Sequence, residues 1–220
     1  MAYKTCVSIA ETTPAKVLST LKKALQKSDY AEIRFDFLAP KDIPMALELT
    51  KKYNKQCVFT LRPKNQGGKF QGTEKERISI LKLIAEYNPY FLDLEFSAAN
   101  KDLIEYIKKT KTQILVSWHD FHGTPSVATL SQKYQKMKKV SKNIKLVTTA
   151  KSIKDTASVL SLYKKQGSGL IAFAMGDYGR ISRILCLHLG APYTYVSLGK
   201  PVAPGQFSLD EIKSLQSLQK

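Results

Sequence analysis

The chain alternates short hydrophobic runs with longer stretches in which apolar residues recur at helical spacing. The short runs are rich in β-branched and aromatic residues, and this alternation is typical of parallel βα units. Eight strands are predicted, at residues 5–10, 31–35, 56–61, 90–94, 113–117, 144–150, 169–174 and 193–197. Helices of ten or more residues are predicted between them. Because no linker or shift in composition interrupts the pattern, it predicts an α/β fold, a (β/α)8 TIM barrel in a single domain, residues 1–220.

Four of the predicted helices begin at recognisable capping sequences. Hydroxyl side chains in front of a helix accept hydrogen bonds from its first free N–H groups. The four sequences are Thr12-Thr13-Pro14, residues 73–76, residues 124–126, and Ser208 followed by Glu211 in a capping box. These sequences mark where four of the predicted helices begin.

Polar residues follow the predicted strands at the positions where a barrel of this type assembles its active site, the C-terminal strand ends. They are Glu32, Arg34 and Asp36 at the end of the second strand, Arg62 after the third, Asp93 and Glu95 at the fourth, His119 and Asp120 at the fifth, Arg183 beyond the seventh, and Gln206 beyond the eighth. Their equivalent positions predict one shared pocket. The glycine-containing loop 64–72 is expected to act as its lid.

Lys145 interrupts the hydrophobic run of the sixth predicted strand. A buried strand does not tolerate a charge unless the charge is used or lost. A desolvated lysine releases its proton more readily, and the neutral amine can condense with a carbonyl to form an imine. The alternative is that Lys145 lies at the strand entrance with its head group in solvent. His119 on the neighbouring strand favours the imine interpretation, because a histidine can exchange protons with such an intermediate, and the pair predicts lyase chemistry.

Other side chains leave two interpretations open. Arg62 and Arg183 have the forked geometry that binds a carboxylate, but each could instead form a structural ion pair with Asp36, Glu32 or Glu95. His119 itself could be a structural histidine. The remaining histidines, His122 in a predicted loop and His188 in a predicted helix, are assigned no catalytic role. The sequence shows no metal-ligand spacing among its histidines and three cysteines.

Composition and charge narrow the choice of partners. The formal net charge is +17, from 35 Lys and Arg against 18 Asp and Glu, but the lysines are spread over predicted helices without an aromatic RNA-binding motif. We therefore expect solvated helix faces or steering of an anionic metabolite, and no nucleic-acid partner. No apolar run approaches the roughly 18 residues that span a bilayer, so no membrane association is expected. The N-terminal hydrophobic run is too short for a signal peptide, which predicts a cytoplasmic protein.

Taken together, these motifs resemble those of the type I 3-dehydroquinate dehydratases. The resemblance extends over the whole chain through six motifs in the same order: Glu32 to Asp36, Thr60-Leu61-Arg62, Ser117 to His122, Lys145, Met175-Gly176 with Ile181-Ser182-Arg183, and Ala203-Pro204-Gly205-Gln206. It implies a (β/α)8 barrel that eliminates water from 3-dehydroquinate to give 3-dehydroshikimate in the shikimate pathway of aromatic amino acid biosynthesis. It also implies a homodimer that needs neither a metal nor an organic cofactor.

The resemblance assigns roles to individual residues. Lys145 is similar to the imine-forming lysine of the family, and His119 to the residue that removes the C2 proton and assists imine formation and hydrolysis. Arg183 resembles the arginine that pairs with the substrate carboxylate. The other implied binding residues, for hydroxyls and for the region near the carbonyl, are Ser8, Glu32, Arg34, Arg62 and Gln206. Apolar walls are expected from Phe121, Phe173, Met175 and Ala203.

Two positions depart from the family pattern. Gln66 stands where many relatives carry a glutamate that supports the catalytic histidine, which predicts a less basic His119. Val202 replaces a serine, in a form similar to the dehydratase domains fused to shikimate dehydrogenase in chlamydia and plants. From the residues alone, two alternatives stay open: a class I aldolase, which shares the imine lysine, and a basic binding barrel without catalysis.

Overall fold

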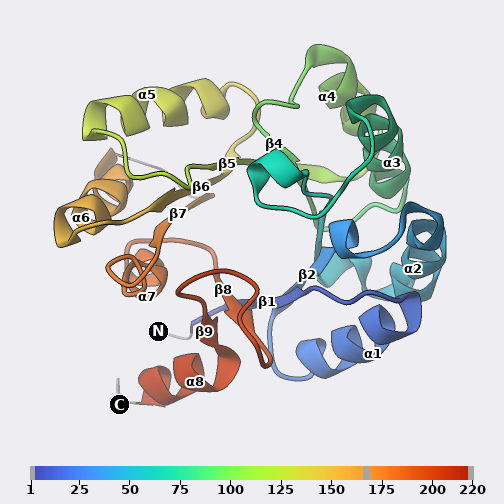
Figure 1. Ribbon diagram of the computed structural model, residues 1–220, viewed down its shortest axis with the longest axis horizontal. Helices are drawn as coiled ribbons and strands as arrows, with labels where there is room; N and C mark the ends of the chain where they lie inside the picture. Colours follow the sequence, from blue (N-terminus) through green and yellow to red (C-terminus); the bar gives the residue numbers. More distant parts are fainter. Residues whose placement is uncertain (1–2, 166–168, 218–220) are drawn as a thin grey trace. The chain divides into compact units, whose positions relative to one another are not determined.

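The computed structural model describes residues 3–165 and 169–217, which form two compact units. The N-terminal unit comprises Val7–Ile114, and the C-terminal unit comprises the chain from Leu115 onward together with the residues before Val7. Each unit alternates strands and helices (Figure 1). No helix in the described part of the chain is long and apolar enough to cross a membrane.

The N-terminal unit contains four parallel strands in the order β1-β2-β3-β4. The strands are β1 (Thr5–Ile9), which begins just before the unit, β2 (Tyr30–Arg34), β3 (Cys57–Thr60) and β4 (Phe91–Glu95). The helices are α1 (Pro14–Leu25), α2 (Ile43–Thr50), α3 (Glu74–Glu86) and α4 (Lys101–Lys108). Short 3-10 turns lie at η1 (Phe35–Phe37), η2 (Pro40–Asp42), η3 (Lys51–Gln56) and η4 (Lys64–Gln66).

In the C-terminal unit, the parallel strands pair in the order β7-β6-β5, and β8 pairs with β9. The strands are β5 (Gln113–His119), which begins just before the unit, β6 (Asn143–Thr149), β7 (Leu170–Met175), β8 (Thr194–Ser197) and β9 (Phe207–Ser208). The helical elements are α5 (Val127–Lys138), α6 (Ile153–Leu160), η5 (Ser161–Lys165), α7 (Ser182–His188) and α8 (Leu209–Ser217).

All eight predicted strands are present, each within two residues of its expected ends, so the βα alternation is confirmed within the described residues. The expected helix length is wrong for α2, α4, α6 and α7, which have seven or eight residues. Two of these helices continue directly as 3-10 helices: α2 is followed by η3, and α6 is followed by η5. The two-residue strand β9 was not predicted, because so short a run carries no period.

All four predicted helix starts are confirmed by their hydrogen bonds. Thr13 accepts a bond from the Lys16 amide in front of α1, where Pro14 occupies the first turn. Thr73 and Glu76 form a capping box on α3. Ser208 and Glu211 bond reciprocally at the start of α8. The fourth start is confirmed at Ser126, which caps α5.

The interiors of the strands are buried, and most of their residues are apolar. Charged exceptions lie on three strands: Glu32 on β2, Asp93 and Glu95 on β4, and Lys145 on β6. Burying a charge is costly unless it is paired or hydrogen-bonded, so these exceptions direct attention to the functional site.

Candidate functional site

Lys145 is the third residue of β6 and its side chain is buried, with 6% of the residue exposed. Its register partners are Ser117 on β5 and Ile171 on β7, so it lies inside a run of three paired strands. The alternative that its head group lies in solvent at the strand entrance is therefore wrong. The burial that the sequence argument required of a reactive lysine is present.

The Lys145 amine lies over the aromatic ring of Tyr195, a buried residue of β8. The distance from Nζ to the ring centroid is 4.0 Å, which is within the range of a cation–π interaction. Sequence reasoning missed Tyr195, because nothing in the chain indicates which aromatic residue of the last strand lies under the lysine.

His119 is the last residue of β5 and lies next to the Lys145 strand. Ser117 is in register with Lys145, and side chains two residues apart on a strand share a face, so His119 and Lys145 point to the same side of the strand pair. The imidazole is half-buried and stacks on Phe121, with 5.9 Å between ring centroids and 10° between ring planes. Phe121 itself is 42% exposed, and its role as an apolar wall stays a prediction.

Arg183, near the start of α7, is a buried arginine without a carboxylate partner in the described part of the chain. Its guanidinium lies 4.3 Å from the ring centroid of Phe173 on β7 and donates a bond of 3.0 Å to the carbonyl of Pro204. The Nε atom has no hydrogen-bond partner among the described residues. Burial lowers the pKa of Arg183 to about 10, because the charged form has lost its hydration.

The loop after β8 is organised by Gln206. The buried Gln206 side chain accepts a bond of 2.8 Å from the backbone N–H of Val202 through its Oε1 atom, so the residue that replaces a serine is held through its main chain. Gly205 has a φ of 70°, and a Cβ there would lie 3.1 Å from the carbonyl oxygen of Gly176. The loop therefore packs closely on the segment that follows β7.

The N-terminal unit carries the other predicted binding residues. Glu32 on β2 is buried and accepts hydrogen bonds of 3.0 Å from the hydroxyls of Ser8 and Thr60, one on each carboxylate oxygen. Arg34, two residues further along, forms a bidentate pair with Asp36 at 2.8 and 2.7 Å. Because Arg34 pairs in register with Thr60, all these side chains except Asp36 share one face of the strands.

The predicted lid, residues 64–72, is attached to these binding residues through its backbone. Asp36 accepts a bond from the Lys69 amide, and the Phe70 amide donates to the carbonyl of Arg62. Gln66, the position that departs from the family pattern, is the last residue of η4 and is half-buried. The mobility of this loop stays a prediction.

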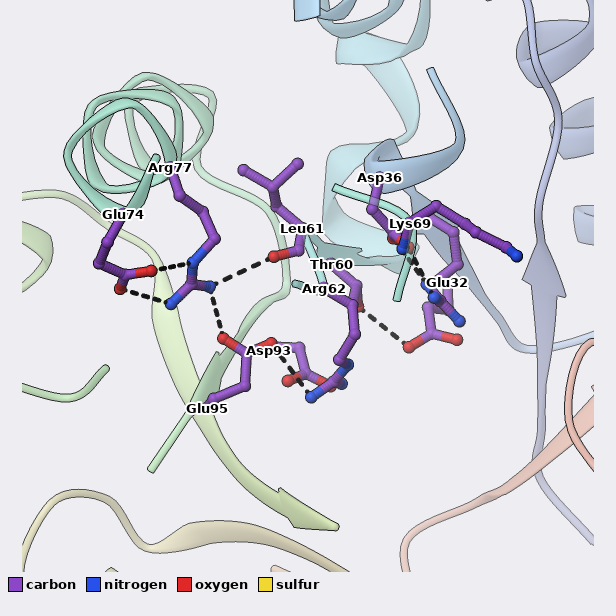
Figure 2. Close-up of polar contacts among 11 residues, drawn as sticks. Glu32, Asp36, Thr60, Leu61, Arg62, Lys69, Glu74, Arg77, Asp93 and Glu95 are labelled. Atoms are coloured by element: carbon purple, nitrogen blue, oxygen red, sulfur yellow. Dashed lines mark hydrogen bonds and ion pairs between the residues drawn. The ribbon is translucent and has the colours of Figure 1, made fainter. Parts of the chain in front are cut away.

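Arg62 follows β3 and is buried against two carboxylates of β4, as Figure 2 shows. Its guanidinium lies 2.7 Å from Asp93 Oδ2 and 3.1 Å from Glu95 Oε1. Burial disfavours the charged form, but the surrounding carboxylates, Asp93 and Glu95 first and then Glu32 and Asp36, together outweigh it, so the pKa of Arg62 is raised. The structural ion-pair interpretation is thus confirmed for Arg62 with Glu95, whereas Arg183 has no such pair. The two arginines differ in electrostatic setting.

A further buried arginine, Arg77 on α3, belongs to the same group of charges and was not identified from the sequence. The remaining histidines lie elsewhere: His122 is exposed after β5, and His188 ends α7, where its Nε2 lies 2.6 Å from the hydroxyl of Tyr3. These placements agree with the predictions of a loop position for His122 and a helix position for His188. Within the described residues no cluster of His, Cys, Asp or Glu could hold a metal ion.

The eight predicted site residues thus divide into two groups. Lys145, His119, Arg183 and Gln206 lie in the C-terminal unit, and Ser8, Glu32, Arg34 and Arg62 lie in the N-terminal unit. The first group combines an amine, an imidazole and an unpaired guanidinium. The second combines a serine hydroxyl, one hydrogen-bonded carboxylate and two arginines, which are suited to hydroxyl groups.

The family model for type I 3-dehydroquinase matches residues 5–220. The chain belongs to the type I 3-dehydroquinase family. It is 32% identical over 218 residues to the 3-dehydroquinate dehydratase of Methanocaldococcus jannaschii, which covers 97% of each chain. The corresponding protein of Methanococcus maripaludis strain C6 is 33% identical over 218 residues, which covers 97% of this chain and 98% of the relative.

A solved structure of the same family has the same fold. The 3-dehydroquinate dehydratase of Geobacillus kaustophilus matches with a TM-score of 0.89 over 99% of this chain and 91% of its own, at 23% identity. At that identity the likeness establishes the fold. The predicted fold class, an α/β (β/α)8 barrel of the type I dehydroquinase kind, is confirmed.

Proposed function

We propose that the protein is a 3-dehydroquinate dehydratase, a hydro-lyase that removes water from 3-dehydroquinate to give 3-dehydroshikimate in the shikimate pathway. The observation that carries the proposal is the buried lysine within β6, beside a histidine on the adjacent strand, in a member of this family. Membership of the family favours the dehydratase over the aldolase and over a binding barrel without catalysis.

In the proposed mechanism Lys145 attacks the substrate ketone and forms an imine with loss of one water molecule. The cationic imine nitrogen withdraws electrons, so the proton on the adjacent C2 becomes acidic. His119 removes that proton, and the electron pair left on carbon expels the β-hydroxyl group. His119 returns the proton to the leaving oxygen, and a water molecule then hydrolyses the imine and frees Lys145. The ring of Tyr195 faces the nitrogen that is cationic in these steps.

The unpaired Arg183 is proposed to bind the substrate carboxylate. Among the described residues this buried guanidinium has no carboxylate partner and its Nε has no hydrogen-bond partner, so an anionic substrate would supply the missing charge. Glu32, Arg34, Arg62, Ser8 and Gln206 are proposed to bind the hydroxyl groups and the region near the carbonyl. In this division of roles, the anionic group is bound by the arginine that has no carboxylate partner among the described residues. The hydroxyl groups are bound by side chains that other residues of the protein already hold in place.

We further propose that the two units act as one catalytic domain, residues 1–220. The support is that the family match runs without interruption across both units. A single cooperative thermal transition, coincident by circular dichroism and by loss of activity, is expected. Two separate transitions would contradict it.

A homodimer in the cytoplasm is also proposed. The supporting surface is a charge-free stripe on α7 and its flanks: Ile181, Leu185 and Leu189 are exposed at helical spacing, and residues 184–199 contain no Asp, Glu, Lys or Arg. In a chain of net charge +17, two copies repel each other, and a stripe without charged residues lets a second copy approach with less repulsion than a lysine-bearing face. Light scattering should give a dimer for the native protein and a monomer for Leu185→Glu.

The test of the activity is direct turnover. Purified protein is incubated with 3-dehydroquinate, and the conjugated ketone of the product is followed by ultraviolet absorbance. Turnover by the native protein and none by Lys145→Met with unchanged circular dichroism is the expected result. A native protein that leaves the substrate intact, or that releases an aldehyde by C–C cleavage, would contradict the proposal.

A further inference from the structure

Helix α3 buries a charge at a position where its pattern calls for an apolar residue. The residues that α3 turns toward the core are Arg77, Leu81, Ile84 and Ala85, and Arg77 is only 2% exposed. Positions 77, 81 and 84 follow the spacing of one helix face. A buried arginine at such a position is costly unless its partners compensate, so its contacts should reveal what it does.

Arg77 makes two contacts that converge on Arg62, as Figure 2 shows. Its NH1 atom lies 2.6 Å from Glu95 Oε2 and donates a bond of 3.3 Å to the carbonyl of Leu61, the residue that immediately precedes Arg62. The other oxygen of Glu95 lies 3.1 Å from Arg62 NH1. Arg77 therefore holds both the main chain before Arg62 and the carboxylate that faces the Arg62 guanidinium.

The opposite side of Arg77 is held at the surface. Its Nε and NH2 atoms form a bidentate pair with Glu74 at 2.8 Å each, and the Glu74 side chain is 57% exposed. The buried part of the chain of charges, Arg77 and Arg62 against Glu95 and Asp93, is neutral in sum. Removing Arg77 would leave this buried group with one excess negative charge, which burial disfavours.

We propose that Arg77 is a positioning residue for the substrate site: it fixes the Glu95 carboxylate, and through Glu95 and the Leu61 carbonyl it sets the position of the Arg62 guanidinium. The proposal rests on the function proposed above, because it deepens the role given to Arg62. Glu95 is the link: its Oε2 accepts a hydrogen bond from Arg77, and its Oε1 lies at ion-pair distance from Arg62 NH1 without accepting a hydrogen bond from a described residue.

The charge state of Glu95 makes this arrangement sensitive to pH. Burial raises the pKa of Glu95 and Asp93 raises it further, whereas Arg62 and Arg77 lower it. Without Arg77 the pKa of Glu95 rises, so the carboxylate gains a proton at a higher pH and its ion pair with Arg62 is lost as pH falls. Glu32 and Asp36 also act on Arg62, but neither replaces the contact with Glu95.

The experiment compares kcat/KM against pH for the native enzyme, Arg77→Met, Arg77→Lys, Glu74→Gln and Arg77→Met with Glu95→Gln. Arg77→Met is expected to lower kcat/KM about 10- to 100-fold, as loss of a supporting contact commonly does, with the loss growing as pH falls. In the double variant, position 95 no longer titrates, so the added acid-side decline disappears. Glu74→Gln keeps the contacts to Glu95 and Leu61 and should stay close to native. Arg77→Lys, which retains the charge without the fork, should fall between native and Arg77→Met.

A purely structural role for Arg77 predicts different results. It would lower the yield of folded enzyme but leave the shape of the pH profile unchanged, and a pH profile of Arg77→Met or Arg77→Lys parallel to the native one would overturn the proposal. Arg77→Lys retains the buried charge, so it supplies the profile if Arg77→Met does not fold. An inactive native enzyme would instead contradict the proposed function, so the two failures are distinct.

Discussion

Substitution by methionine should change the thermal stability of the protein little at Arg183 and lower it strongly at Arg62, the two buried arginines of the candidate site. Arg183→Met removes a buried guanidinium. Burial has taken this group out of water, and no carboxylate among the described residues compensates for the lost hydration. The pKa of Arg183 is lowered to about 10 by this burial. Compared with an ordinary arginine, that change corresponds to about 3 kcal/mol of stability withheld from the native state at neutral pH.

Substitution removes this cost together with two favourable contacts. The bond from Arg183 to the Pro204 carbonyl contributes about 1.5–3 kcal/mol as a hydrogen bond to a charged group, and the contact with Phe173 contributes about 1 kcal/mol. In the free energy of unfolding, the burial cost that the substitution removes nearly cancels the two contacts that it loses. We expect Arg183→Met to unfold within about 3 °C of the native protein, while kcat/KM falls about 10²- to 10⁴-fold because the substrate carboxylate loses its partner.

Arg62→Met is the matched control. Arg62 contacts Asp93 and Glu95 inside the protein, and its removal leaves those buried carboxylates without that partner. Breaking such a pair costs about 3–5 kcal/mol, which lowers Tm by about 10 °C in a chain of this size. The assay is thermal unfolding by circular dichroism at pH 7 for the three proteins, with kcat/KM measured on the same preparations. An Arg183→Met protein destabilised as much as Arg62→Met would refute the claim that Arg183 is held without a partner for an anionic substrate.

Three further substitutions test the geometry of the site. A Cβ at Gly68 would lie 2.0 Å from the carbonyl oxygen of Arg62, so Gly68→Ala should displace Arg62 and lower kcat/KM on the order of 100-fold. A Cβ at Gly123 would meet nothing within 4 Å, so the control Gly123→Ala should keep kcat/KM within about twofold of the native value. Tyr195→Leu removes the ring under the imine nitrogen and should lower kcat about tenfold, while Tyr195→Phe keeps the ring and most of the rate; equal losses would argue against a role of the ring face. His119→Ala should slow both elimination and imine hydrolysis by about 10²- to 10⁴-fold, which single-turnover kinetics can separate.

The strands could be predicted because a buried strand appears in the sequence as a short run of apolar and β-branched residues. Strand β6, for example, is a β-branched run whose single charge stands out, and that contrast is enough to identify Lys145 from the sequence alone. Helix starts were predictable for the same reason, since a cap such as Thr73 with Glu76 is a contact between near neighbours in the chain. Helix lengths were not, because the turn from α2 into η3 depends on packing against other elements.

Contacts between residues far apart in the sequence could not be predicted. Nothing near Arg62 in the chain shows that it pairs with Asp93 while Arg183 has no carboxylate, and the two arginines look alike from sequence. Tyr195 was missed because its importance comes from lying under Lys145, 50 positions earlier. Arg77 did leave a local trace, a charge in the apolar stripe of α3 with Leu81 and Ile84, and a helical projection would have found it.

The central claim is that the Lys145 amine forms an imine with the substrate ketone, and reduction with borohydride tests it most directly. The native protein is treated with borohydride in the presence of 3-dehydroquinate, digested and analysed by mass spectrometry. A mass gain is expected on the peptide that carries Lys145 and on no other lysine peptide, with no gain when the substrate is omitted. A protein that turns over the substrate yet gains no mass, or gains it on a different lysine, would contradict the account.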